Sequence, residues 1–375
     1  MSILIGADIY PSKSNEEFFS SGNMDSVVGD ELKKILFKAD YRVFNLETPL
    51  IDAAMPIRKS GPAIKANVST VNGIKAIGAD LLTLANNHIM DQGVCGLLST
   101  FDVLKKNGIN FIGAADCLNN SIKPFIAVVC GKKIGFYACC EHEFSIASEK
   151  TPGANPFDPI ESFDHVEKLR RECDYLIILY HGGKEYYPYP SPMLQKVCRK
   201  FIEKGANLVV CQHSHCIGCE EKFLDGTIVY GQGNFIFNTC DEPIERTSLL
   251  IKIDELLNVS YIPLVKCGNG VRMAEGDNAK SILMDFYCRS EQIKQDSFVE
   301  SGYRKFAEER IKGYLLNFSG YGHKLHLRIL NRLTRGRFTN YYVKRIYKKN
   351  DILLLQNYIE CEAHRELLLE GLKQF

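Results

Sequence analysis

The sequence lacks any long apolar stretch. Although 45% of its 375 residues are hydrophobic, none of its apolar runs approaches the roughly 18 residues of a membrane-spanning helix. The first apolar run is short, Ile3–Ala7, and no basic segment precedes it. These absences argue against a helical membrane protein and against a secretory signal peptide. We therefore expect a cytoplasmic protein.

A net charge of one sign is also missing. The chain has 46 Lys and Arg against 45 Asp and Glu, so its overall charge indicates no class of partner. One segment departs from this balance, because Gly320–Asn350 contains no acidic residue and nine basic ones. The segment has three interpretations: a solvated helix face, a surface that docks to anionic lipid headgroups or acidic polysaccharide, or a nucleic-acid site. Nothing else in the chain favours nucleic acid.

The chain is rich in cysteine, with fourteen residues, but they are scattered and often lie inside apolar runs. Free buried thiols in a reducing compartment are therefore a better interpretation than a disulfide framework. One close group, Cys211, His213, His215, Cys216 and Cys219, has the residue types of a structural zinc site. This alternative is weak because neighbouring strand residues point to opposite faces of a sheet.

Short apolar runs alternate with amphipathic stretches up to about residue 240, as expected for a layered α/β domain with a mostly parallel sheet. Helices are predicted at 24–39, 68–77, 97–106, 163–173 and 193–204, and strands at 109–113, 125–130, 134–139, 247–253 and 281–287. A hairpin turn is predicted at Cys130-Gly131-Lys132-Lys133. The long loops 49–66 and 141–160 are expected to frame a substrate mouth. We predict one domain over residues 1–290 and a basic helical extension over 291–375.

Five further apolar runs, at 3–7, 41–44, 81–85, 176–180 and 208–210, are also predicted strands, and each is followed by residues that can bind a metal. Because ligands of open α/β sheets gather beyond the carboxyl ends of the strands, five such ends predict one shared metal site. The candidates are Asp8, then Asn45 and Glu47, then Asn86, Asn87 and His88, then His181, and finally His213 and His215.

The order of these motifs resembles that of the bacterial capsule-synthesis CapA family, also called the poly-γ-glutamate capsule biosynthesis family. This family belongs to the calcineurin-like metallophosphoesterase superfamily. The resemblance covers about residues 2–240. Its motifs are Gly6-Ala7-Asp8, Asn45-Leu46-Glu47, Ala85-Asn86-Asn87-His88 with Asp91-Gln92-Gly93, His181-Gly182-Gly183-Lys184-Glu185-Tyr186, Gln212-His213-Ser214-His215 and Tyr230-Gly231-Gln232-Gly233-Asn234-Phe235.

The resemblance implies a two-layer β-sandwich flanked by helices (α/β/β/α), with two divalent ions of manganese, zinc or iron at the strand ends. Glu47, or Asn45, takes the place of the bridging carboxylate. The implied metal ligands are Asp8, Glu47, Asn87, His181, His213 and His215. The implied catalytic residues are His88, Asp91 and Glu185, and the substrate-binding residues are Asn45, Asn86, Tyr186 and Asn234.

Two departures from the superfamily pattern bear on the metals. The first motif is usually Asp-x-His, but Tyr10 stands here in place of the histidine, so one metal loses an imidazole. The second motif carries Glu47 instead of an aspartate. The number and identity of the metals therefore stay open at this point.

The expected activity is hydrolysis of a phosphomonoester or phosphodiester by metal-activated water. The resemblance implies a role in capsule or other cell-envelope polysaccharide biosynthesis, on a phosphorylated saccharide or a polymer-linked substrate. Two alternatives stay open: an amide-bond hydrolase or transferase of poly-γ-glutamate type, and a catalytically degenerate binding or assembly component. The basic segment Gly320–Asn350 also allows a peripheral location on the inner membrane.

Overall fold

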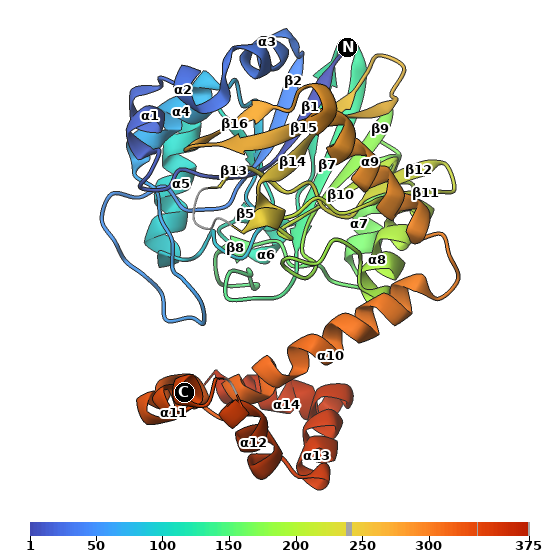
Figure 1. The fold of residues 1–375 in the computed structure, drawn as a ribbon. Helices are drawn as coiled ribbons and strands as arrows, with labels where there is room; N and C mark the ends of the chain where they lie inside the picture. Colours follow the sequence, from blue (N-terminus) through green and yellow to red (C-terminus); the bar gives the residue numbers. More distant parts are fainter. Residues whose placement is uncertain (238–241, 336, 374–375) are drawn as a thin grey trace. The chain divides into compact units, whose positions relative to one another are not determined.

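A computed structural model of the chain describes residues 1–237, 242–335 and 337–373 (Figure 1). The chain divides into two compact units, Met1–Glu300 and Ser301–Phe375. The boundary expected between residues 290 and 291 therefore falls inside the first unit.

The first unit contains two large sheets. In the first sheet, the neighbouring strands β1, β2, β3 and β4 are parallel, and an antiparallel meander joins them through β14. Strand β13 pairs with the end of β1. The strand order is β16 (Gly270–Met273), β15 (Val259–Cys267), β14 (Thr247–Ile253), β1 (Ile3–Tyr10), β2 (Tyr41–Leu46), β3 (Leu81–Thr83) and β4 (Asn110–Ile112), with β13 (Asn234–Phe237) off this path.

The second sheet has a parallel centre of β7, β9, β10 and β12 and an antiparallel strand at each edge. Its order is β11 (Glu220–Phe223), β12 (Gly226–Val229), β10 (Leu208–Gln212), β9 (Tyr175–His181), β7 (Lys132–Cys140) and β6 (Phe125–Val129). A small third sheet pairs β5 (Ala114–Ala115) with β8 (Gly153–Ala154).

Side-chain alternation along the strands builds the layers. In β7, Phe136 and Ala138 belong to a core shared by the two large sheets, whereas Tyr137 and Cys139 belong to a second core under α7 (Ser162–Arg170) and α8 (Pro192–Glu203). This alternation is the period of two expected for a strand that is covered on both faces.

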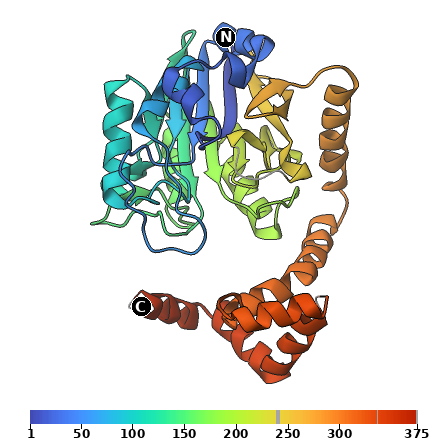
Figure 2. The same cartoon turned by 60° about the vertical axis from the view of Figure 1, so that its left-hand side comes forward.

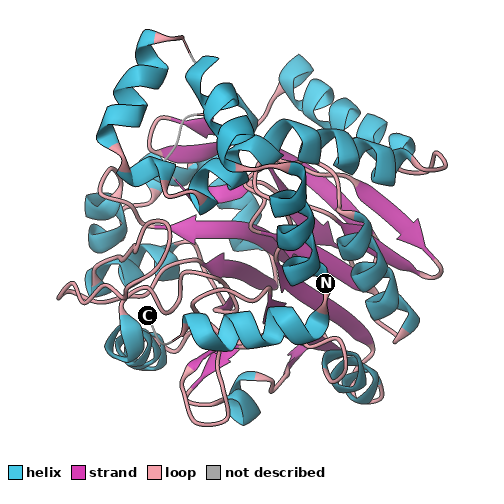
Figure 3. Cartoon of the chain, turned by 90° about the horizontal axis from the view of Figure 1, so that it is seen from below, coloured by secondary structure: helices cyan, strands magenta, loops and turns pink. Residues whose placement is uncertain are grey.

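Helices cover the outer faces of both sheets (Figure 3). Buried residues of α3 (Asp30–Lys38), α4 (Val71–Ala76), α5 (Gly93–Lys106) and α9 (Gly276–Gln292) belong to the same continuous hydrophobic cluster as the strands of the first sheet. The predicted α/β/β/α sandwich is thereby confirmed. The remaining short helices of this unit are α1 (Glu16–Ser21), α2 (Asp25–Val28), η1 (Val68–Thr70), α6 (Leu118–Ser121) and η2 (Pro243–Glu245).

Most of the predicted elements form close to their expected positions. The hairpin turn is confirmed, because Val129 pairs with Lys132 and the two residues between them, Cys130 and Gly131, have φ angles of 48° and 82°. The helix predicted over 24–39 is wrong as a single element. It breaks at Gly29, whose φ of 67° and ψ of 160° lie outside helical geometry and separate α2 from α3.

The strand predicted over 281–287 is wrong, because this segment lies inside helix α9. Ile282, Phe286 and Ser290 are its buried residues, and their four-residue spacing is the period of one helix face. A short apolar run cannot by itself distinguish a strand from a buried helix segment.

The second unit consists of helices, drawn from orange to red in Figure 2. Helix α10 (Phe298–Phe318) leads into it, and η3 (Tyr321–His323), α11 (Leu325–Leu333), α12 (Arg337–Ile346), α13 (Lys349–Glu360) and α14 (Glu362–Leu372) follow. Among the described residues, no helix combines the length and apolar character needed to cross a bilayer.

Candidate metal centre

The predicted ligands meet where parallel strands of both sheets end. Asp8 on β1 lies beside Asn45 on β2, and His181 on β9 lies beside Gln212 on β10. The register between β1 and β2 shifts between Ile5 and Asp8, which is a bulge-like irregularity of the kind often found next to active sites. The His213 backbone N–H contacts Asp8, so side chains at the carboxyl ends of both sheets lie together.

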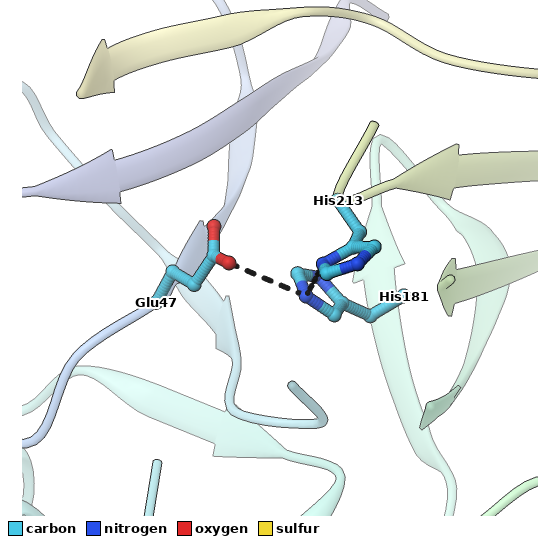
Figure 4. A group of neighbouring side chains, drawn as sticks. All are labelled: Glu47, His181 and His213. Carbon is cyan, nitrogen blue, oxygen red and sulfur yellow. Dashed lines mark hydrogen bonds and ion pairs between the residues drawn. The ribbon is translucent and has the colours of Figure 1, made fainter. Parts of the chain in front are cut away.

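Glu47 lies at the centre of this cluster. It belongs to two groups of side chains whose ligand atoms all lie within 4.8 Å of one another: Glu47 with His181 and His213, and Glu47 with Asp8 and His215. Figure 4 shows the first group, with the Glu47 carboxylate pointing toward the two imidazoles. Because Glu47 is shared by both groups, its position would suit a carboxylate that contacts more than one metal ion.

The surroundings of Glu47 fit a cation. The residue is fully buried, and neither carboxylate oxygen has a hydrogen-bond partner among the residues that the structure describes. Burial raises the pKa of Glu47 well above its ordinary value, and the nearby Asp8 charge raises it further. A buried carboxylate without donors is costly, and bound divalent ions would supply the compensating charge.

The His181 ring gives a second test of fit. Its Nε2 lies 3.0 Å from Asn87 Oδ1, 3.1 Å from His213 Nδ1 and 3.4 Å from Glu47 Oε1. A single ring N–H can serve only one of these atoms, whereas a metal ion bound among them could accept lone pairs from all four. Burial lowers the pKa of His181 to about 4 and that of His213 well below its usual range, which keeps both imidazoles in the neutral form that metals bind.

The group around Asp8 is held by neighbouring polar atoms. The Asn45 amide donates to Asp8 Oδ1 at 2.8 Å, and the His213 backbone N–H donates to Asp8 Oδ2 at 3.2 Å. His215 Nδ1 lies 2.8 Å from Asn234 Oδ1, so an Nδ1–H donated to Asn234 leaves Nε2 free as a ligand. Burial by itself lowers the pKa of His215, but the Glu47 and Asp8 charges outweigh it and raise the pKa.

Asn45 and Asn86 are fully buried and bind the protein itself. The Asn86 amide donates to Asn45 Oδ1 and to the Leu46 carbonyl, each at 2.9 Å, and Asn86 Oδ1 accepts the His88 backbone N–H at 3.1 Å. These contacts give both asparagines a positioning role. Their assignment as substrate contacts stays a prediction.

His88 is oriented by a buried carboxylate. Its Nδ1 lies 2.6 Å from Asp91 Oδ2, which also accepts the Ile64 backbone N–H at 2.8 Å. The Lys59 ammonium donates to Asp91 Oδ1 at 2.6 Å and to the Asn87 carbonyl at 3.3 Å. Lys59 was not predicted as a site residue, because only folding of the loop 49–66 brings it to Asp91.

The second long loop also reaches the centre. Glu143 Oε2 accepts from the Asn87 amide at 3.3 Å, and the Ser145 hydroxyl donates to the Asn87 carbonyl at 2.6 Å. A small cavity at this point is lined by Asn87, Glu141, Glu143, His181, Gly182 and His213. Both loops expected to frame a mouth thus contact ligand-bearing residues, although no pattern in the sequence indicates which loop residues do so.

Glu185 and Tyr186 lie at the edge of the cluster. The Glu185 side chain is 40% exposed and pairs with Lys184 at 3.6 Å. The Tyr186 ring lies 6.0 Å from the His215 ring, and its backbone N–H donates to the Ser214 carbonyl at 2.9 Å. Tyr186, His213 and His215 all have positive φ, of 60°, 89° and 56°. Such backbone strain persists only where the surrounding structure enforces it.

The alternative zinc site does not form among the described residues. His213 and His215 belong to the two groups around Glu47, and neither group contains a cysteine. Cys211 instead points into the core under α8, where its Sγ lies 3.6 Å from Cys198 Sγ. Cys216 and Cys219 are buried, and burial raises the pKa of both thiols.

The fold and the site define an α/β/β/α sandwich with a buried carboxylate and imidazole cluster suited to metal ions. The family model of the bacterial capsule synthesis protein PGA_cap matches residues 3–239, which is more than half of the chain. The chain therefore belongs to this family.

Two curated relatives share 26% identity with the chain. One is the capsule biosynthesis protein CapA of Bacillus anthracis, over 54% of this chain and 52% of the relative. The other is the PGA biosynthesis protein CapA of Bacillus subtilis (strain 168), over 62% of each. The matched region thus spans between one half and two thirds of each relative.

Among solved structures, a novel phosphatase from Mycoplasma pneumoniae matches with a TM-score of 0.43 and 14% identity, over 80% of this chain and 98% of that one. A 5'-nucleotidase precursor from Thermus thermophilus matches with a TM-score of 0.42 and 14% identity, over 76% and 58%. Likenesses at this level do not define a reaction for this chain.

Proposed function

We propose that this protein is a hydrolase that uses two divalent metal ions to cleave a phosphomonoester or phosphodiester bond. The observation that supports the proposal most strongly is Glu47. It is a fully buried carboxylate that has no hydrogen-bond partner in the described part of the chain, and it is shared by two groups of potential ligands. A structural role in the apo protein would instead call for donors to this carboxylate.

Asp8, Glu47, Asn87, His181, His213 and His215 would hold the metals. When bound, two such ions activate a water and neutralise the oxygens of a transferring phosphoryl group. The protein's own part is to fix these ligands before the substrate arrives. Asn45 holds Asp8, Asn234 holds His215, and Glu143 with Ser145 orients Asn87.

His88 is the proposed general acid, or a contact to the phosphate. Its Nδ1 is bound to Asp91 at 2.6 Å, which leaves Nε2 as the atom that can give a proton to the leaving oxygen. Lys59 and the Ile64 backbone N–H hold Asp91 from its other sides. The imidazole is thereby fixed in one orientation at the edge of the metal cluster.

The proposed substrates are phosphorylated saccharides or polymer-linked phosphates of capsule or other cell-envelope polymers. The support for this class is the capsule biosynthesis named in the family and in the Bacillus anthracis relative. Tyr186, half-buried beside His215, offers an aromatic face on which a sugar could stack.

The first experiment is elemental analysis of the purified protein before and after loading with Mn²⁺, with Asp8→Ala and His213→Ala as variants. We expect about two metals per chain in the wild type and a loss of metal and phosphate release in the variants. Full metal content and activity in both variants would overturn the proposal.

A second candidate reaction is amide hydrolysis or transfer, because one relative is described by PGA biosynthesis. Metal-activated water can attack either bond, so the ligand set does not separate the two reactions. Parallel assays of phosphate release and amine release on the metal-loaded protein distinguish them.

The third candidate, a catalytically degenerate binding component, is motivated by Tyr10 in place of the usual first-motif histidine. Purified protein that takes up neither Mn²⁺, Zn²⁺ nor Fe, yet captures components of polymer synthesis, would favour it over both reactions.

A further inference from the structure

The second unit differs from the first in the sign of its charge. Ser301–Phe375 has 15 Lys and Arg against seven Asp and Glu, a formal charge of +8. Nine of these cations, and none of the acidic residues, lie in Gly320–Asn350, which contains helices α11 and α12. This is a surface that attracts anionic partners.

Helix α11 also exposes a continuous apolar strip. Leu325, Ile329 and Leu333 follow one another at four-residue spacing, and their exposed fractions are 66%, 53% and 75%. Arg328 and Arg332 are exposed too, and each lies three residues after a member of the strip. Residues three and four apart share a helix face, so the two cations flank the apolar strip directly.

The other side of α11 is already occupied, which fixes the direction of this strip. The Leu327 carbonyl accepts the Tyr321 hydroxyl at 3.1 Å, and Asn331 Oδ1 accepts the Thr339 backbone N–H at 3.2 Å. Tyr342 of α12 lies near Tyr321, with ring centroids 5.5 Å apart. These contacts hold α11 against α12 and leave Leu325, Ile329 and Leu333 on the outer face.

Helix α12 adds a second cationic face. Arg337, Tyr341, Lys344 and Arg345 are exposed, and their spacing of three and four residues places them on one side of the helix. An Arg345 guanidinium N–H donates to the Tyr341 hydroxyl at 3.2 Å. Cations beside an amphipathic aromatic ring are typical of side chains at a membrane–water interface.

We propose that α11 and α12 dock on an anionic lipid bilayer, with the Leu325–Ile329–Leu333 strip in the acyl boundary and the flanking cations at the phosphates.

An anionic polymer such as a polysaccharide would use the cations but not the apolar strip. A second copy of this unit would cover the strip but bring two strongly positive surfaces together. Only anionic lipid matches both features. The proposal does not depend on the reaction catalysed by the first unit.

Co-sedimentation of the full chain with lipid vesicles tests the proposal. We expect binding to vesicles of phosphatidylcholine with phosphatidylglycerol, and much weaker binding to phosphatidylcholine alone. Arg328→Gln with Arg332→Gln should lower the partition coefficient roughly 25-fold, about five-fold for each cation lost. Arg365→Gln with Lys373→Gln, in α14 and just after it, is the matched control and should change it little.

The apolar strip is tested in the same assay by Leu325→Ser with Leu333→Ser. This double variant should also lose binding, whereas Leu367→Ser with Leu369→Ser, at exposed positions of α14, should keep it. Far-ultraviolet circular dichroism checks that all four variants retain their helices. Unchanged binding in the Leu325 and Leu333 double variant would mean a purely electrostatic contact and would overturn the proposed insertion of the strip into the bilayer.

A fluorescence measurement locates the inserted face. The chain contains no tryptophan, so Ile329→Trp introduces a single reporter on the strip and Leu368→Trp a single control on α14. Anionic vesicles should shift the emission of the first to shorter wavelength and leave the second unchanged. The absence of a shift at residue 329 would overturn the proposal. Light scattering that shows self-association of the chain, lost in the Leu325→Ser and Leu333→Ser double variant, would also overturn it and would assign the strip to a contact between copies of the chain.

Discussion

The two units break the usual distribution of side chains in opposite ways. The first unit, with 31 Lys and Arg against 38 Asp and Glu, buries polar residues: Asp8, Asn45, Glu47, Asn86 and Asp91 have no exposed surface. The second unit, with a charge of +8, exposes large apolar residues. Buried polar groups and exposed apolar strips are both costly in a folded protein, so each marks a place where the chain is adapted to something other than its own stability.

The two units should also differ in how strongly they respond to single substitutions. The metal centre depends on atoms from both sheets and two loops held within a few ångströms, so single changes should have large effects. The surface of α11 depends on area and charge summed over many residues, so single changes there should have small effects. The four predictions that follow test this contrast.

The largest effect is expected for Glu47→Ala. Removing the carboxylate shared by both ligand groups should abolish binding of at least one metal and lower hydrolytic activity on the order of 10⁴-fold, because metal ions contribute several kcal/mol to the transition state. Elemental analysis and a phosphate-release assay measure both. Glu203→Ala, at an exposed ion pair with Lys200, is the control and should leave both unchanged. Equal activity in the two variants would refute the central role of Glu47.

The next effect is expected for Asp91→Ala. This change leaves the Lys59 side chain, only 3% exposed, without its anionic partner, and breaking a buried pair in this way costs about 3–5 kcal/mol. Urea unfolding of the metal-free protein measures the loss. Asp277→Ala, which removes a fully exposed partner of Lys280, should cost less than about 1 kcal/mol. Similar costs at the two positions would contradict the buried position of the Lys59–Asp91 pair.

A smaller effect is expected for Glu47→Gln. This change should alter the free energy of unfolding, and the sign of the change should depend on whether metal is bound. In the metal-free wild type the folded pKa of Glu47 lies well above the ordinary value of 4.5. The contribution of Glu47 to the free energy of unfolding is therefore fully present when the pH is below this ordinary pKa. It is lost as the pH rises through the raised pKa of the folded state. Near neutral pH the metal-free variant should be more stable than the wild type, on the order of 2 kcal/mol, and near pH 4 the two should agree.

Added Mn²⁺ should reverse this order, because the amide is a poorer ligand than the carboxylate. Thermal unfolding across pH, with and without metal, measures both signs. A wild type that is more stable than the variant in metal-free buffer at neutral pH would show that Glu47 is compensated by the protein itself.

The smallest effect is expected for Leu333→Ala. Its side chain is 75% exposed, so its truncation should change the free energy of unfolding by no more than about 0.5 kcal/mol. Leu179→Ala in β9, 1% exposed and part of the core between the sheets, should cost about 2–5 kcal/mol. Chemical denaturation of both variants gives the comparison. A large cost at Leu333 would mean that α11 uses its strip for folding.

Much of the first unit could be predicted from the sequence. Asp8, His181 and the closing His213 and His215 each follow an apolar run, and parallel strands bring such residues to one edge of a sheet. The same local logic failed for 281–287, because an apolar run of this length fits a strand or a buried helix equally well, and tertiary packing such as that of Phe286 against Tyr261 decides between them. The exact end of the first unit stays outside what periodicity can predict.

The sequence by itself determined the ligand types and their order, the family, and the excess of positive charge in Gly320–Asn350, because composition and strand patterns are local properties of the chain. Only the tertiary structure decided that Glu47 is shared by two ligand groups, that Lys59 and Glu143 support the centre, and which side of α11 is left uncovered. These facts depend on contacts between residues far apart in the sequence, such as His213 with Asp8 and Lys59 with Asp91. Such contacts exist only after the two sheets and their loops have packed, so no local pattern could contain them.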